Sequence, residues 1–274
     1  MKHSHRKGHI LLETNYIDSI MEFLSTLGKK LVTFSPEKIE ILSEVNENLK
    51  TNIDQISHDF IMGKLNLISR LPVISEEDPI SISKIRPNKY WIIDPIDGTR
   101  SLVNGYQTYV CQVALIEDGI PIMSVVYEPA FNNFYHSIKG QGSYKNDQKL
   151  NSNLQKLPDS IIDNYPEPIS SIKNLIKTTS ISKYIECGSI ALKMCRVADM
   201  SADLFLKKTR VFDWDIAPAA LIVQEMGGVL STLSGRQILF EGNFKKDNLL
   251  VSANQSMHGY TLGKISELNE FNDC

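Results

Sequence analysis

The apolar residues of this 274-residue chain change their spacing along the sequence, and this change constrains the fold more than any other feature. In the first part they recur at helical spacing around residues 17–31 and 53–68, with Thr14 as the expected cap of the first helix. Across residues 90–138 they form runs of strand length, two of them joined by the turn Asp118-Gly119. The first half is therefore predicted to pack two helices against an antiparallel sheet.

The second half has a different pattern, because strand-like and helix-like segments alternate in it. A polar zone with three prolines, residues 151–171, separates it from the first half. Beyond this zone the pattern predicts strands near 180–185, 202–206, 229–232 and 249–252, with helices at 190–200, 216–226 and the carboxyl end. Such alternation is typical of α/β units. The predicted fold class is α/β, with an α+β first half (residues 1–155) and an α/β second half (residues 156–274).

The composition excludes several classes of partner. A formal net charge of −3 leaves no basic footprint for a nucleic acid polymer or an anionic membrane. No window reaches the roughly 18 apolar residues that a membrane helix needs. The basic, His-rich start at residues 1–9 has no apolar segment behind it, so we expect a frayed terminus or a cloning remnant rather than a secretory signal. The expected partner is a small molecule.

The cysteines indicate a reducing compartment. None of the four belongs to a Cys-x-x-Cys pair, and two lie within apolar runs: they are Cys111, Cys187, Cys195 and Cys274. Buried thiols in a cytoplasmic protein fit this pattern better than a disulfide framework does.

The segment Trp-Ile-Ile-Asp-Pro-Ile-Asp-Gly-Thr-Arg, residues 91–100, carries two carboxylates three residues apart, Asp94 and Asp97. On a regular strand these side chains would point to opposite faces. Pro95 removes an amide donor and is expected to end the strand, so that the chain curls and the carboxylates converge. The alternative interpretation is a loop turn in which one aspartate caps the backbone.

The residues around these aspartates add further donors. The carbonyl of Ile96 is expected to be free to bind a metal ion, and Gly98 allows close approach of the backbone. A helix beginning at Thr99 would offer its free amides to an anion. Carboxylates, a carbonyl and water are the ligands that Mg²⁺ prefers.

Three other acidic positions can complete such a site. The pair Glu76-Glu77 follows an apolar strand-like run, although acidic pairs are commonly solvated surface. Asp215 opens an apolar helix, where it is either a helix cap or a metal ligand, and Asp213 is expected at the surface. Asp54 lies at the start of the second predicted helix.

In this order and spacing, the motifs resemble those of the inositol monophosphatase superfamily, and most closely the bacterial 3′(2′),5′-bisphosphate nucleotidases. The segments that carry the resemblance are Glu76-Glu77, residues 94–99, Trp214 to Ala217, residues 113–116, residues 125–129 and residues 188–193. The resemblance implies a layered αβαβα sandwich and a Mg²⁺-dependent phosphatase. It also implies a homodimer and inhibition by Li⁺.

The resemblance implies a role for each motif residue. One Mg²⁺ ion would be held by Glu76, Asp94 and the Ile96 carbonyl, a second by Asp94, Asp97 and Asp215, and a weaker third by Glu76 and solvent. Asp54 and Thr99 would orient the attacking water, while the Gly98 and Thr99 amides would steady the phosphate. Phosphoryl transfer needs this kind of positioning and charge neutralisation more than covalent help.

The substrate is indicated by basic residues. Lys208 stands where inositol phosphatases carry a glutamate that binds substrate hydroxyls, and Lys193 resembles a nucleotidase lysine that follows Gly188-Ser189. We expect Gly188, Ser189, Lys193 and Lys208 to contact a substrate that carries a second phosphate. The alternative interpretation of Lys208 and its basic neighbours is a solvated loop. The leading hypothesis is hydrolysis of 3′-phosphoadenosine 5′-phosphate to AMP and phosphate.

The loop before Asp54 departs from the nucleotidase pattern. Asn46 and Leu49 replace an aspartate and a proline, which puts the third metal site and the substrate pocket in doubt. An inositol phosphatase, or a phosphatase specialised for another sugar, nucleoside or biosynthetic phosphate, is the alternative enzyme. A metal-tuned regulatory or binding protein on the same fold is the alternative outside catalysis.

Overall fold

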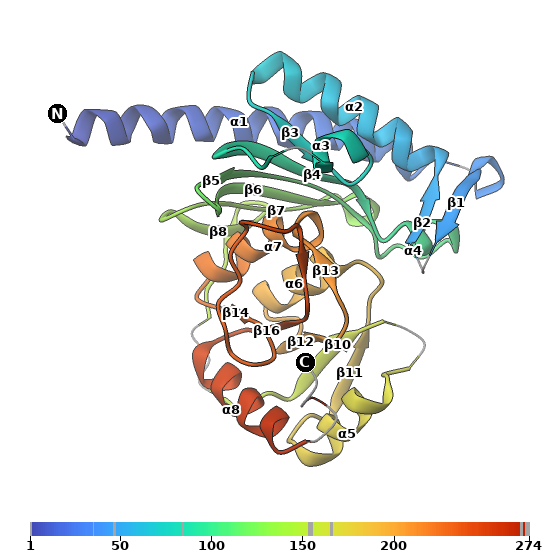
Figure 1. The fold of residues 1–274 in the computed structure, drawn as a ribbon, viewed down its shortest axis with the longest axis vertical. Helices are drawn as coiled ribbons and strands as arrows, with labels where there is room; N and C mark the ends of the chain where they lie inside the picture. Colours follow the sequence, from blue (N-terminus) through green and yellow to red (C-terminus); the bar gives the residue numbers. More distant parts are fainter. Residues whose placement is uncertain are drawn as a thin grey trace.

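The computed structural model describes residues 2–34, 36–45, 48–83, 85–152, 156–164, 167–268 and 271. Its helices and sheets form alternating layers in the order αβαβα, stacked from top to bottom in Figure 1. Helices α1 and α2 form the first layer, α6 and α7 the middle layer, and α5 and α8 the last. The layered α/β prediction is confirmed.

The upper sheet has seven strands in sequence order. They are β3 (Val73–Ser75), β4 (Lys89–Asp97), β5 (Val110–Glu117), β6 (Ile120–Glu128), β7 (Asn133–Ile138), β8 (Gly142–Lys145) and β9 (Gln148–Lys149). Every neighbouring pair is antiparallel except β3 and β4, which run parallel. The predicted turn Asp118-Gly119 joins β5 to β6 with both residues at positive φ, as a tight hairpin requires.

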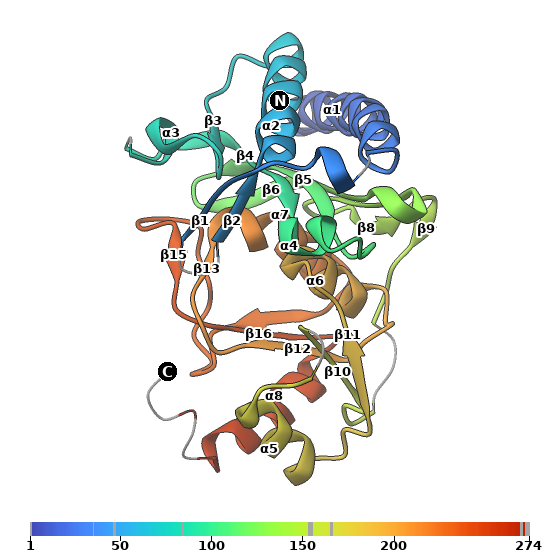
Figure 2. The ribbon, with the colours of Figure 1, turned by 90° about the vertical axis from the view of Figure 1, so that its right-hand side faces the viewer.

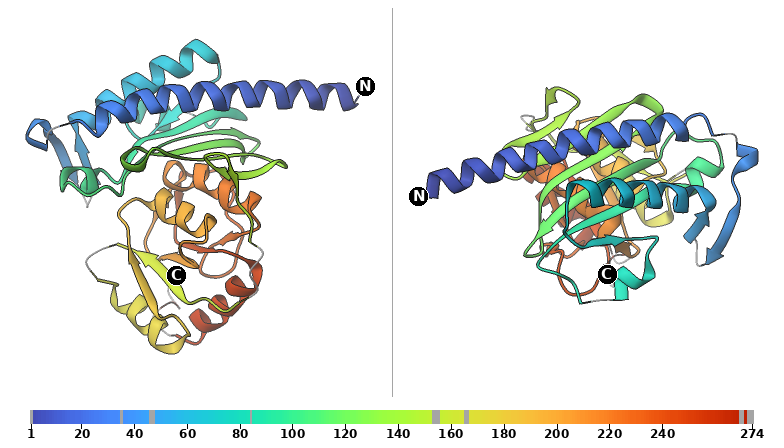
Figure 3. Two further views of the ribbon diagram at one scale, coloured as in Figure 1. Left: turned by 180° about the vertical axis from the view of Figure 1, so that it is seen from behind. Right: turned by 90° about the horizontal axis from the view of Figure 1, so that it is seen from above.

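Two long helices, α1 (Lys2–Leu31) and α2 (Asn52–Ile68), cover the outer face of this sheet (Figure 3). The expected cap at Thr14 and the frayed start are wrong, because α1 begins twelve residues earlier, at Lys2, and runs beyond the sheet. The segment before Thr14 contains no proline, so no residue in it forbids a helix. Apolar side chains such as Leu24 are buried against the sheet.

The lower sheet has five strands in the order β11-β10-β12-β16-β14. They are β10 (Ser160–Asp163), β11 (Lys183–Glu186), β12 (Leu204–Lys207), β14 (Val229–Ser231) and β16 (Leu249–Ser252). The helices of this half are α5 (Ser170–Thr178), α6 (Ile190–Ala198), α7 (Asp213–Glu225) and α8 (Gln255–Ser266). Strand β10 and the start of α5 lie inside the zone predicted to be a polar separator. The prediction of a polar separator is therefore wrong. Strand β10 was missed because it is only four residues long and because its two apolar residues, Ile161 and Ile162, lie among polar residues and prolines.

One core joins the two sheets. Helix α7 is buried on nearly every side, and its apolar residues belong to the same cluster as Ile92 of the upper sheet and Val251 of the lower sheet. A second cluster lies between the upper sheet and the outer helices, around Trp91 and Leu24. The division at residues 155 and 156 stays a prediction.

Smaller elements flank the middle layer. The hairpin β1 (Ile41–Val45) and β2 (Asn48–Thr51) lies above the pair β13 (Val211–Phe212) and β15 (Lys245–Lys246) in Figure 2. Short helical turns complete the chain: η1 (Pro36–Lys38), α3 (Pro79–Ser83), α4 (Thr99–Val103) and η2 (Pro129–Phe131). Within the ranges that the structure describes, no helix is both long and apolar enough to cross a membrane.

The predicted buried thiols are confirmed where they are described. Cys111, Cys187 and Cys195 are free and buried. Cys274 lies outside the described residues.

Candidate active site

Strand β4 carries Asp94 and Asp97 past the proline between them. The expected end of the strand at Pro95 is wrong, because β4 continues to Asp97. Asp94 pairs with Gln112 and Asp97 with Val110, so three steps on β4 oppose two steps on β5. This extra residue is a β-bulge, a feature that bends a strand and redirects its side chains.

The bulge places both carboxylates on one face of the sheet. Before it, Ile93 packs in the outer cluster and Ile92 in the inner one, as strand alternation requires. After it, Ile96 again belongs to the outer cluster, although it lies three residues beyond Ile93. Asp94 and Asp97 therefore both face the second half of the chain. The convergence was predicted correctly, but its cause is a bulge within the strand and not the end of the strand.

Three carboxylates from three elements meet at this end of the sheet. One oxygen from each of Glu76, Asp94 and Asp215 lies within 4.8 Å of the others. Glu76 follows β3, whose parallel pairing aligns Ser75 with Ile93, so Glu76 emerges beside Asp94. Asp215 arrives from below, in the first turn of α7, where its Oδ2 accepts a hydrogen bond from the Phe212 amide at 2.8 Å.

The three carboxylates repel one another at a site where Asp94 is buried and Glu76 and Asp215 are half-buried. Burial raises the pKa of Glu76 and of Asp94, and the charges of neighbouring carboxylates raise both further. Burial, followed by the charge of Asp97, raises the pKa of Asp215 to about 8. A cation at this point would relieve the repulsion, and three carboxylates are a donor set that suits a hard divalent ion. The residues present therefore fit a metal site.

Asp97 stands beside this trio and is held by α6. Its Oδ2 accepts hydrogen bonds from the Ser189 hydroxyl and the Ala191 amide, both at 2.6 Å. Ser189 is fully buried, and its Oγ also caps α6 by accepting from the Leu192 amide at 2.9 Å. A side chain at Gly188 would overlap the Ser101 hydroxyl, so a larger residue there would displace Ser101 of α4. Gly188 and Ser189 thus position Asp97 in this structure, and their contact with a substrate stays a prediction.

Asp54 and Thr99 are 45 residues apart in sequence and in direct contact in space. The Thr99 hydroxyl donates to Asp54 Oδ1 at 2.7 Å. It also lies 3.1 Å from the carbonyl oxygen of Ile96, so that carbonyl is not free of partners as predicted, although a second lone pair is left for a metal ion. The other carboxylate oxygen accepts from the amide of Thr51 at 2.7 Å and from its hydroxyl at 2.5 Å. Burial raises the pKa of Asp54, and these hydrogen bonds oppose the rise. Gly98 precedes α4 with φ of 98°, a conformation that other residues rarely adopt.

Glu77 is held by the neighbouring hairpin. Its side chain is 7% exposed and forms an ion pair with Lys50 of β2. Burial raises the pKa of Glu77, the hydrogen bond from Lys50 lowers it, and the charge of Asp54 raises it. Glu77 is therefore an ion-paired neighbour of the site and not solvated surface. Asn46 lies outside the described residues.

Sequence reasoning missed three residues at this site: Lys50, Thr51 and Gln112. The Thr51-x-x-Asp54 spacing is a capping-box signature and could have been found. Gln112 is a polar residue in the middle of an apolar strand, which is also a signal. Its amide lies 3.4 Å from Asp94 Oδ2 and from the Asp215 carbonyl, between the two halves. Lys50 had no local signal, because its partner lies 27 residues away.

The predicted surface position of Asp213 is wrong. This carboxylate is fully buried and pairs with Arg86 at 2.7 Å and with Lys246 at 3.2 Å. Burial raises its pKa to about 6 against the effect of both cations. The first turn of α7 packs against β15, which the sequence pattern did not predict. The ion pairs fix the start of the helix that carries Asp215.

The two lysines predicted to contact substrate lie in different surroundings. Lys193 is fully buried, where it donates to Asn164 and lies 5.1 Å from the ring centre of Phe205. Burial lowers its pKa to about 8. Lys208 is partly exposed and lies 5.6 Å from the ring centre of Phe271. The described contacts of both are within the protein, and their contact with a substrate stays a prediction.

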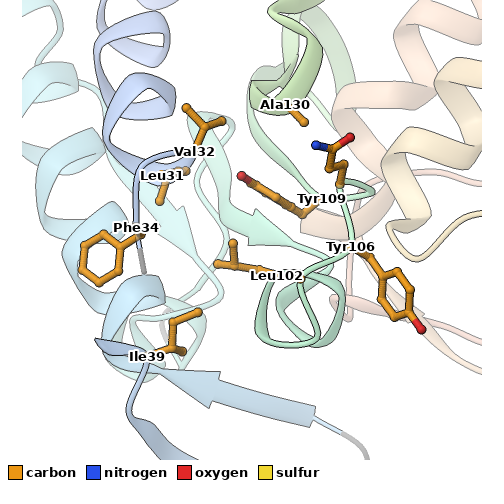
Figure 4. A pocket seen from close by; sticks show the side chains of 10 residues that line it. Leu31, Val32, Phe34, Ile39, Leu102, Tyr106, Tyr109 and Ala130 are labelled. Carbon is orange, nitrogen blue, oxygen red and sulfur yellow. The ribbon is translucent and has the colours of Figure 1, made fainter. Parts of the chain in front are cut away.

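A pocket of about 240 Å³ lies between the end of α1 and the segment from Leu102 to Tyr109 (Figure 4). Tyr109 extends into it toward Leu31 and Val32. Among the described residues, none with a charged side chain lines it; the lining residues are Leu31, Val32, Phe34, Ile39, Leu102, Gly105, Tyr106, Gln107, Tyr109 and Ala130. A phosphate ester would find no cation there, so the acidic site and not this pocket is the candidate active site.

Carboxylates gathered at a sheet end, beside a hydrogen-bonded Asp-Thr pair, define the class: a metal-dependent phosphoric monoester hydrolase. A family model described as the inositol monophosphatase family matches residues 19–270. The chain belongs to this family.

Named relatives within the family differ in what they are called. The chain is 30% identical over 227 residues to the 3′(2′),5′-bisphosphate nucleotidase CysQ of Buchnera aphidicola, covering 80% of this chain and 85% of that protein. It is also 30% identical over 237 residues to the putative Nus factor SuhB of Neisseria meningitidis serogroup B, covering 82% and 87%.

Solved structures share the fold. An IMPase/NADP phosphatase complexed with Mg²⁺ and phosphate superposes with a TM-score of 0.79 at 23% identity, covering 93% of this chain and 95% of that one. A staphylococcal inositol monophosphatase in an inhibitory complex soaked with LiCl also gives 0.79, at 22% identity and the same coverage. At these identities the likeness establishes the fold.

Proposed function

We propose that this chain is a 3′(2′),5′-bisphosphate nucleotidase that hydrolyses 3′-phosphoadenosine 5′-phosphate to AMP and phosphate. The observation that carries the hydrolytic part is the hydrogen bond of 2.7 Å between Thr99 and Asp54 next to the carboxylates of Glu76, Asp94 and Asp215. This arrangement combines a metal-binding donor set with a group that can orient water.

The cofactor is Mg²⁺. One ion would be held by Glu76, Asp94 and the Ile96 carbonyl, a second by Asp94, Asp97 and Asp215, and any third by Glu76 and solvent. When bound, the metal supplies charge neutralisation for the phosphate and lowers the pKa of a bound water.

The side chains that orient the water belong to the first half. Thr99 donates a hydrogen bond from its hydroxyl to Asp54, so the lone pairs of its oxygen are left to accept a hydrogen bond from water. Asp54 is fixed by Thr51, which keeps the Thr99 hydroxyl pointing the same way. The amides of Gly98 and Thr99, at the start of α4, would steady the phosphate oxygens.

The choice of substrate is supported by a nucleotidase relative and by basic residues. Lys207 ends β12, and Lys208 and Arg210 lie between β12 and β13, just before the helix that presents Asp215. Cations at that position suit a substrate with a second phosphate. An inositol phosphatase, or one for another sugar, nucleoside or biosynthetic phosphate, is the alternative enzyme, since relatives and structural neighbours include IMPases.

A panel of phosphate esters tests the substrate. Phosphate release is measured with Mg²⁺ on 3′-phosphoadenosine 5′-phosphate, inositol 1-phosphate, NADP and a sugar phosphate. The nucleotidase proposal expects the highest kcat/KM on the bisphosphate nucleotide. Lys208→Ala should raise KM for that substrate more than for inositol 1-phosphate. Lys177→Ala, an exposed lysine on the distant α5, is the matched control. Higher turnover of inositol phosphate contradicts the substrate assignment.

A second candidate is a metal-tuned binding or regulatory protein on this fold. It is favoured by the relative whose name is putative Nus factor, because that name does not describe an enzymatic activity. Mg²⁺-dependent phosphate release that disappears in Asp94→Asn eliminates it. No release on the whole panel, with metal still bound, supports it.

We further propose that the protein is a cytoplasmic homodimer inhibited by Li⁺. The Li⁺ proposal is supported by the LiCl complex of the staphylococcal structure. Light scattering at micromolar concentration measures the oligomeric state, and a monomer contradicts the dimer. Full activity at tens of millimolar Li⁺ contradicts the inhibition. Fractionation of cells by compartment tests the location.

A further inference from the structure

A lysine ammonium stands next to the acidic site in this chain. Lys50 of β2 is 31% exposed and forms its ion pair with Glu77, whose side chain is 7% exposed. Glu77 directly follows Glu76, and the charge of Asp54 acts on it. The ammonium is therefore placed at the edge of the carboxylate group, on the side of the hairpin.

The position of Lys50 is fixed by the structure around it. Thr51, the next residue, caps α2 and holds Asp54 with its amide and hydroxyl. On β1, Glu44 pairs with Arg100 of α4 at 2.7 Å. The hairpin is thus tied to α2 on one side and to α4 on the other.

The ammonium of Lys50 competes with divalent ions for carboxylate oxygens. The carboxylates of this region are Asp54, Glu76, Glu77, Asp94, Asp97 and Asp215. A carboxylate that binds an ammonium has fewer lone pairs to offer a divalent ion, and the two cations repel each other at short range. An ion near Glu77 would have to displace Lys50 or share its carboxylate.

We propose that Lys50 is a built-in cation that takes Glu77 out of metal binding and so limits the number of divalent ions that this site holds. The inference rests on the proposed metal-dependent function. It assigns to Glu77 and Lys50 a role that is separate from the residues that hold the catalytic metal. Removing the ammonium should open a further cation site at Glu77.

Mn²⁺ titration of the metal-free protein, followed by the electron paramagnetic resonance of free Mn²⁺, tests this. Lys50→Gln keeps a hydrogen-bond donor without the charge, and Lys50→Arg keeps the charge. Relative to wild type, Lys50→Gln should bind one more Mn²⁺ per chain, or bind the weakest ion about tenfold more tightly. Lys50→Arg should titrate as wild type. Adding Glu77→Gln to Lys50→Gln should remove the extra ion.

Lys89→Met is the matched control for loss of a surface ion pair. Lys89 is 27% exposed and pairs with Glu117 at 3.1 Å, at the opposite end of β4. It should leave the Mn²⁺ titration unchanged. If Lys50→Gln binds with the number and affinity of wild type, the inference is overturned while the proposed function stands. If wild type itself binds no Mn²⁺, the proposed function fails and the inference fails with it.

Discussion

Two buried aspartates, one in each half of the molecule, have opposite surroundings. In the second half, Asp203 accepts hydrogen bonds from the amides of Asp159 and Ser160, at 2.8 and 3.0 Å, and pairs with Lys156. In the first half, Asp94 accepts from the Ile96 amide at 3.1 Å and faces other carboxylates. The charge of Asp203 is satisfied by donors of its own half, whereas the site around Asp94 leaves negative charge that suits an added cation.

The first half supplies most of the residues of the candidate active site, and the second half completes that site. The first half supplies the trio's Glu76 and Asp94 and the Asp54–Thr99 pair from strand ends and helix starts. The second half supplies Asp215 and the amino terminus of α6, which holds Asp97. The site exists only because α6 and α7 pack beneath the upper sheet.

The largest expected effect comes from a carboxylate of the first half. Asp94→Asn should lower Mg²⁺-dependent phosphate release by about 10³-fold, because it removes a charge at the centre of the trio. Steady-state phosphate release measures it. Asp118→Asn, in the exposed turn between β5 and β6, is the control and should keep full activity. Equal activities in the two variants would show that the acidic cluster is not the active site.

Thr99→Ala should have the next largest effect, about 10²-fold on kcat, because the attacking water loses its orienting hydroxyl. Thr99→Ser keeps the hydroxyl and should recover most of the rate. The affinity for Mg²⁺, measured by calorimetry, should change little in either variant. A loss of rate that serine does not recover argues against the hydroxyl as the orienting group.

Ser189→Ala tests the contribution of the second half. It removes a helix cap, which costs about 1 kcal/mol of unfolding free energy. It also frees Asp97, which should weaken Mg²⁺ binding about tenfold. Asn254→Ala removes the cap of α8, where Asn254 accepts from the Met257 amide at 2.9 Å, and is the matched control. The control should lose similar stability with no change in Mg²⁺ binding; a matching loss of Mg²⁺ affinity contradicts the positioning role.

The acidic site and the interior of the second half should also respond to pH with opposite signs. The raised pKa of Asp215, about 8, means that the folded metal-free protein holds protons that the unfolded chain releases. Stability of the metal-free protein should therefore fall as pH rises from about 4 to about 8. Saturating Mg²⁺ should suppress this slope. Melting temperatures across this range, with and without Mg²⁺, measure it, and a slope that Mg²⁺ leaves unchanged contradicts the assignment.

His258 of the second half gives the opposite and smaller slope. It is buried, contacts the hydroxyls of Ser231 and Ser252, and burial lowers its pKa to about 4. The unfolded chain binds a proton at higher pH than the folded one, so acidification from pH 7 to 4 should cost about 3 kcal/mol. His258→Gln should remove this loss in the Mg²⁺-saturated protein. A slope that survives the substitution assigns it to other groups.

The sequence predicted the parts of the site that are local in the chain. The run from Asp94 to Thr99 and the start of α2 at Asp54 could be read because their signals lie within a few residues. Three other features could not be predicted from the sequence: the bulge after Asp94, the burial of Asp213 and the partner of Lys50. Each depends on a contact with a residue far away in the chain, and no local pattern encodes such a contact.

The same reason explains the fold elements that were missed. Strand β10 is short, and its burial comes from its two parallel neighbours rather than from its own composition. The beginning of α1 lacked an apolar repeat, yet nothing in it opposed helix continuation. Long periodic segments such as α2 and β5 were predicted because their period repeats several times.

The central claim is that carboxylates from both halves form one metal-dependent phosphatase site. Phosphate release from 3′-phosphoadenosine 5′-phosphate, titrated with Mg²⁺ in wild type and in Asp215→Asn, tests it most directly. The account predicts saturable Mg²⁺ dependence in wild type, complete loss with a chelator, and a large loss of rate in Asp215→Asn with the fold intact. Release that persists with a chelator, or an unchanged rate in Asp215→Asn, would contradict it.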